Sequence, residues 1–101
     1  MTLGAPRHVE HLVLEGELDL VGAPDVERQV AAALQRGVET LVLHLDEVRF
    51  LDSCGLRALL GAADAAGRAG VDLRILPGPE PVMAVIEAAG LAGRLPFVGY
   101  P

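Results

Sequence analysis

The sequence predicts an α/β fold, in which helices pack on a largely parallel sheet. Three segments with the character of strands, at residues 9–18, 40–45 and 71–75, alternate with three segments of helical periodicity. Repeated alternation of strand and helix is typical of right-handed crossovers, which place successive strands parallel in one sheet. At 101 residues the chain has the size of one domain, and we expect residues 1–101 to form it.

The first two strands differ in their expected burial. Residues 9–18 are mostly apolar with polar members between, and residues 1–7 are a candidate for a further strand at the edge. Residues 40–45 are apolar apart from His44, as is typical of a central strand buried on both faces. The polar residues 46–49 predict a loop after this strand.

The C-terminal part of the chain contains the third strand. Apolar residues alternate with Asp72 and Arg74 over residues 71–75, which is the pattern of a strand. Residues 95–98 are expected to add a last short extended piece. Together with the first two strands, these segments give the order strand, helix, strand, helix, strand, helix.

The three helices are delimited by residues that favour helix ends. Pro24 suits the first turn of a helix over residues 23–36, and Gly37 follows its last turn. The second helix is expected from Gly55 to Gly70 and the third over residues 81–89. The residues expected to face the sheet are Val26, Val30, Ala33 and Leu34 in the first helix, Leu56, Leu59, Leu60, Ala63 and Gly67 in the second, and Val82, Val85, Ile86 and Ala89 in the third.

Composition and charge exclude several functional classes. The net charge is −6, and the eight basic residues, all arginine, are scattered among fourteen acids, so no basic face for nucleic acid or an anionic membrane is expected. No apolar run approaches the roughly 18–20 residues of a membrane-spanning helix. The single cysteine cannot form an internal disulfide, which fits a cytoplasmic protein. Aromatic residues make up only 3 %, so the core must be aliphatic.

Two polar clusters follow strands, at the edge of the sheet where ligands and partners of such folds gather. They are residues 15–19 and residues 52–55, and the second contains Ser53, the only serine of the chain. A serine at a helix start is usually an N-cap. A helix N-terminus also favours phosphate, and a phosphoryl group on Ser53 would add about −1.5 to −2 charges beside Asp52 and Asp19.

Other chemistry at this cluster has weaker support. Ser53 lacks the flanking glycines of a nucleophile elbow and a nearby triad base. Cys54 would be activated at a helix N-terminus, but neither a second cysteine nor the phosphatase pattern accompanies it. For metal binding, His8 and His11 fall on opposite faces of an extended strand, and no complete ligand set follows. No nucleotide-binding glycine loop is present, and we expect no cofactor.

Two features of the charged residues point to a contact surface. Glu15, Glu17 and Asp19 alternate by two, so they share one face if the strand extends that far. Arg57 lies in the first turn of the second helix, where a cation is disfavoured. It either pairs with Asp52 or Asp64 or stands on a surface that contacts a partner.

Three stretches of the chain resemble the STAS domain family, specifically its stand-alone anti-sigma-factor antagonists. They are Gly16–Asp19 followed by an Ala-Pro helix start, the segment Phe50–Leu56 with its Asp-Ser-x-Gly-Leu pattern, and the Ala-Gly-Leu ending of residues 86–91. The resemblance implies a four- to five-stranded mixed, largely parallel sheet with helices packed against it. Arg57 departs from the small residue that the family often has after Gly-Leu.

The resemblance also implies a switch without an active site of its own. The unphosphorylated antagonist binds an anti-sigma factor that is also a serine kinase, and so frees a sigma factor for transcription. The kinase phosphorylates the motif serine, here Ser53, the modified antagonist lets go, and a serine phosphatase restores it. The residues expected to bind the partner are Glu17, Asp19, Asp52, Ser53, Cys54, Gly55 and Arg57.

Two alternatives remain open at this point. A STAS domain can also be a constitutive interaction subunit of a transport or signalling complex, which binds without phosphorylation. A small thiol enzyme using Cys54 is the third possibility.

Overall fold

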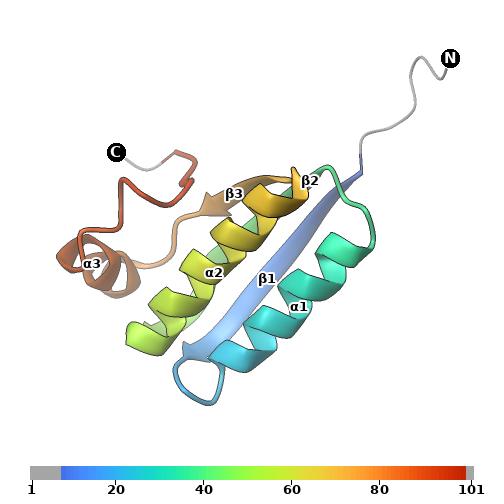
Figure 1. Cartoon of the computed structure of the whole chain (residues 1–101). Coiled ribbons are helices and arrows are strands. Elements are labelled where there is room, and N and C mark those ends of the chain that lie inside the picture. Colours follow the sequence, from blue (N-terminus) through green and yellow to red (C-terminus); the bar gives the residue numbers. More distant parts are fainter. Residues whose placement is uncertain (1–7, 100–101) are drawn as a thin grey trace, which may run out of the picture.

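The computed structural model describes residues 8–99 and has the expected alternation of strands and helices (Figure 1). The elements within this range are β1 (Val9–Leu18), α1 (Ala23–Gln35), β2 (Thr40–Leu51), α2 (Ser53–Ala69), β3 (Asp72–Leu76) and α3 (Glu80–Ala88). The α/β prediction is therefore confirmed, and most element bounds lie within about two residues of those expected. The candidate edge strand over residues 1–7 lies outside the described residues.

The sheet is parallel and its strands follow the chain in order, β1-β2-β3. Because both crossovers step in the same direction, right-handed connections place α1 and α2 on the same face of the sheet, as Figure 1 shows. Within residues 8–99 the sheet has three strands where four to five were expected. The C-terminal extended piece is present as one parallel bridge, between Ile75 and Phe97.

Strand β2 is longer than predicted, and the expected loop over residues 46–49 is wrong. The pairing of β1 with β2 shifts twice, so that Val13 and Glu15 pair with His44 and Glu47, and each shift adds one residue to β2. Because of these bulges, every third residue in the second half of β2 is buried in the core, namely Leu45, Val48 and Leu51. Period-two alternation is thereby lost, which is why the polar residues resembled a loop.

The core is aliphatic, as expected. Its largest fully buried side chains are Leu14, Leu18, Leu41, Leu43, Leu45, Val48, Leu59, Ile75, Val82 and Ile86. The predicted inner face of α2 is partly wrong, because the buried residues are Gly55, Ala58, Leu59, Ala62 and Ala66, whereas Leu60 and Gly67 are exposed. The buried alanines of α2 are four residues apart and let α1 approach α2 closely. The contact with α1 therefore determines which face of α2 is buried. In α3, Met83 is buried and Ala89 is exposed, contrary to expectation.

One ion pair joins the start of β1 to the end of α1. Arg36 donates from Nε to Glu10 Oε1 at 2.9 Å and from its terminal nitrogen to the other carboxylate oxygen. These hydrogen bonds hold the pKa of Glu10 below its ordinary value and raise that of Arg36. The pair lies at the opposite end of β1 from the two predicted polar clusters.

Candidate functional site

The carboxyl ends of β1 and β2 meet at the predicted site. Leu18 pairs with Leu51, and Asp52, the residue that follows β2, donates its backbone N–H to Leu18 O at 3.3 Å. The segments that leave the two strands therefore start side by side. A Cβ added to Gly55 would lie 2.4 Å from Leu18 O, so glycine allows the first turn of α2 to pack directly on the end of β1.

Asp52, and not Ser53, caps α2. Its carboxylate accepts hydrogen bonds from Cys54 N at 2.8 Å and Gly55 N at 3.3 Å, and its backbone is extended. The expectation that Ser53 is the N-cap is wrong, because the aspartate one residue earlier already satisfies these N–H groups. Ser53 is the first helical residue and is exposed, and within residues 8–99 its hydroxyl has no hydrogen-bond partner.

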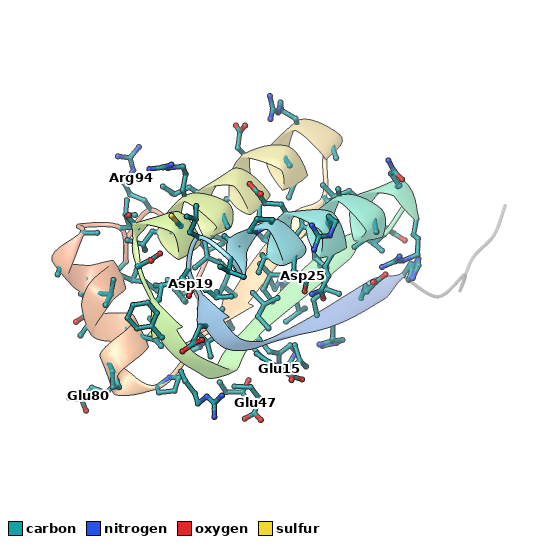
Figure 2. All side chains as sticks on the ribbon, turned by 90° about the horizontal axis from the view of Figure 1, so that it is seen from below. Glu15, Asp19, Asp25, Glu47, Glu80 and Arg94 are labelled. Carbon is teal, nitrogen blue, oxygen red and sulfur yellow. The ribbon has the colours of Figure 1, made fainter. Side chains whose placement is uncertain are left out.

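Asp19 organises the loop between β1 and α1. Its carboxylate accepts from Val21 N at 3.0 Å and Gly22 N at 2.9 Å, and it is half-buried. The predicted row of Glu15, Glu17 and Asp19 is thus wrong for Asp19, which lies past the end of the strand and turns into its own loop. The two glutamates are exposed, and Figure 2 shows Glu15 on the side of the sheet away from α1 and α2.

An apolar tip beside the site was missed from the sequence. Leu20 and Val21 are 75 % and 86 % exposed. Leu20 borders a hollow of about 150 Å³ whose opposite wall includes Cys54 and Arg57. The sequence did contain a sign of this surface, because two consecutive large apolar residues are unusual in a short loop that connects a strand to a helix. Leu20 and Val21 are hereafter the apolar tip.

Arg57 is an exposed residue of α2. Asp52 is engaged by the first turn of α2, and Asp64 pairs with Arg68 at 2.7 Å. Among residues 8–99, Arg57 has no ion-pair partner. Its predicted pairing with Asp52 or Asp64 is therefore wrong, and its place on a contact surface stays a prediction. Cys54, by contrast, is half-buried against the core.

A hollow larger than the one beside Leu20 lies elsewhere on the molecule. It has a volume of about 470 Å³, and its walls include Glu15, Asp46 and Glu47, which come from β1 and from the bulged part of β2. None of the residues around Ser53 lines it. Figure 2 shows Glu15 and Glu47 on the sheet face opposite α1 and α2.

Comparison with known proteins agrees with this architecture. The model of the STAS domain family matches residues 5–98. The chain belongs to the STAS domain family. The anti-sigma F factor antagonist of Paenibacillus polymyxa is 32 % identical over 85 residues, which cover 83 % of this chain and 73 % of that relative.

Two solved structures are similar to this STAS domain. An anti-sigma factor antagonist from Mycobacterium paratuberculosis has a TM-score of 0.81 and 25 % identity, covering 95 % of this chain and 81 % of its own. The Bacillus cell fate determinant SpoIIAA in its phosphorylated form has a TM-score of 0.67 and 21 % identity, covering 92 % and 83 %. At 21 % identity, the likeness to SpoIIAA is one of fold alone. In the described part of this STAS domain, no helix is long and apolar enough to cross a bilayer.

Removing the cap of α2 should weaken the STAS domain measurably. We expect Asp52→Ala to lower the free energy of unfolding by about 1 kcal/mol, because two N–H groups of the first turn lose their acceptor. Asp52→Asn keeps an acceptor oxygen in place and should lower the free energy of unfolding by only a few tenths of a kcal/mol. Urea denaturation of the three proteins measures the difference. Equal losses for both variants would show that charge, and not capping, is what Asp52 contributes.

Proposed function

We propose that this STAS domain is an anti-sigma-factor antagonist whose binding is switched off by phosphorylation of Ser53. The observation that carries the proposal is the state of Ser53, the only serine of the chain, which is exposed at the start of α2 with no hydrogen-bond partner among the described residues. The relative and the structural neighbour named as antagonists of anti-sigma factors support the same function.

The local geometry suits a reversible phosphate. Asp52 already caps the helix, so modifying Ser53 breaks no bond that holds α2 in place. A phosphoryl group would sit at the positive end of the helix dipole, yet beside the Asp52 carboxylate. Modification would then add about −1.5 to −2 charges to the surface while leaving the fold intact.

The partner surface would combine this switch with the apolar tip. Leu20 and Val21 offer exposed apolar area, and Arg57 offers a free cation across the hollow. The other residues proposed for the surface have different parts. Glu17 is exposed near the end of β1, and Asp19 holds the loop that follows it. Asp52 caps α2, Cys54 lines the hollow, and buried Gly55 lets α2 approach β1.

In this proposal the protein is a cytoplasmic substrate and switch, not an enzyme. The anti-sigma factor that it binds would be the serine kinase that modifies it, and a serine phosphatase would reverse the modification. Binding of the unphosphorylated form would free a sigma factor. The protein would contact neither DNA nor a membrane, in keeping with its net charge of −6.

Incubation with a serine-kinase anti-sigma factor from the same genome and ATP tests the proposal. The intact mass should rise by one phosphate group, and Ser53→Ala should abolish the rise. Thr40→Val is the matched control, since Thr40 is half-buried in β2 and its removal should leave phosphorylation unchanged. Phosphate on the Ser53→Ala protein would refute the assignment. Binding of the anti-sigma factor without any phosphorylation would favour the constitutive interaction subunit.

A further inference from the structure

The fold brings two histidines from adjacent strands into contact. His11 in β1 and His44 in β2 are 33 residues apart, yet His11 Nδ1 lies 2.8 Å from His44 Nε2. The rings have centroids 5.1 Å apart and are tilted by 47°. The register explains the contact, because His11 pairs with Val42 and Val13 with His44, which places both imidazoles diagonally on one face of the sheet.

We propose that His11 and His44 form a two-ligand site for a divalent transition-metal ion, with Zn²⁺ as the test ion. Imidazole nitrogens are preferred ligands of zinc, copper and nickel, whereas magnesium and calcium take oxygen ligands. Zinc–nitrogen bonds of about 2.0–2.1 Å place two ligand nitrogens about 3.0–3.4 Å apart. The two nitrogens share a hydrogen bond at 2.8 Å, so to bind an ion the rings must part by a few tenths of an ångström and the shared proton must move to another ring nitrogen.

The surroundings allow a small adjustment of the rings. His11 is exposed, so its ring has room to turn toward a shared ion, whereas the half-buried ring of His44 has less freedom. Val9 and Val13 flank His11 along β1 and carry no charge. With two protein ligands, water molecules complete the coordination.

The charges on this face do not oppose a cation. The register places Arg74 beside Val42 in the same row as His11, and Arg74 donates to Asp72 Oδ2 from Nε at 3.1 Å and from Nη2 at 3.0 Å. The guanidinium is thus neutralised by its neighbour. The net charge of −6 also raises the local concentration of cations. The site shares no residue with the surface around Ser53, so it stands independently of the proposed function.

Calorimetric titration of the full chain with ZnCl₂ tests the site. We expect one Zn²⁺ to bind per chain, and His11→Ala and His44→Ala each to weaken binding about tenfold or more. His8→Ala is the matched control, because His8 is exposed and precedes β1, and it should bind Zn²⁺ like the parent. Far-ultraviolet circular dichroism confirms that each variant is folded.

Three results would overturn the site. They are the absence of Zn²⁺ binding at millimolar concentration, binding that survives in folded His11→Ala protein, and binding that is lost equally in His8→Ala. The NMR signals of the imidazole protons give a second readout, in which those of His11 and His44 should shift together on addition of Zn²⁺ and those of His8 should not.

Discussion

Gly55→Ala is expected to destabilise the protein by about 2–3 kcal/mol, although alanine is the better helix former. The added Cβ would lie 2.4 Å from Leu18 O, 2.5 Å from Leu51 Cδ1 and 2.8 Å from Leu18 Cβ. Two of these atoms belong to the end of β1, one of them to its backbone, and cannot swing aside as the tip of a side chain would. The first turn of α2 must move away from the sheet instead, which opens the core beneath it.

A second glycine of the same helix provides the control. A Cβ on Gly61 would meet nothing within 4 Å, so Gly61→Ala gains helix propensity without a clash. We expect it to raise the free energy of unfolding by about 0.5–1 kcal/mol. Urea denaturation of both variants should show that the same substitution lowers the free energy of unfolding at Gly55 and raises it at Gly61. A Gly55→Ala protein as stable as the parent would show that α2 does not need its close approach to Leu18.

The fold was largely predictable because the apolar residues of most elements recur with the regular period of a strand or of a helix. Strand β1 was predicted with the bounds it has, since it is mostly apolar and helix-start signals follow it. The second half of β2 was not predictable in this way, because its bulges follow from pairing with β1 and give its buried residues a period of three. The inner face of α2 depends on where α1 lies, which no pattern within α2 contains.

The position of Ser53 in the fold was predicted, but the hydrogen bonds around it were not. The sequence located Ser53 at a strand-to-helix junction between acids, but capping was assigned to the serine although Asp52 performs it. Both residues are good caps, and only the backbone geometry of the junction decides between them. The contact between His11 and His44 was equally hidden, because it depends on the register of two strands.

Phosphorylation of Ser53 is expected to weaken binding of the anti-sigma factor by about tenfold or more. The phosphoryl group would place about −1.5 to −2 charges beside Asp52 and next to Cys54, which lines the same hollow as Leu20. A partner that buries this surface would have to desolvate that charge next to a carboxylate. Surface plasmon resonance of the phosphorylated and unphosphorylated protein on immobilised anti-sigma factor measures the ratio.

Three variants separate the switch from the surface. Ser53→Ala should bind like the unphosphorylated protein and unfold within about 0.5 kcal/mol of it, because the hydroxyl is exposed and does not cap α2. Ser53→Glu, with one charge, should lie between the unmodified and phosphorylated forms. Leu20→Ala should weaken binding whether or not Ser53 is modified, since it removes apolar contact area and no charge. If the phosphorylated protein bound as tightly as the unmodified one, Ser53 would be a passive residue on the surface, and the function would be that of a constitutive interaction subunit.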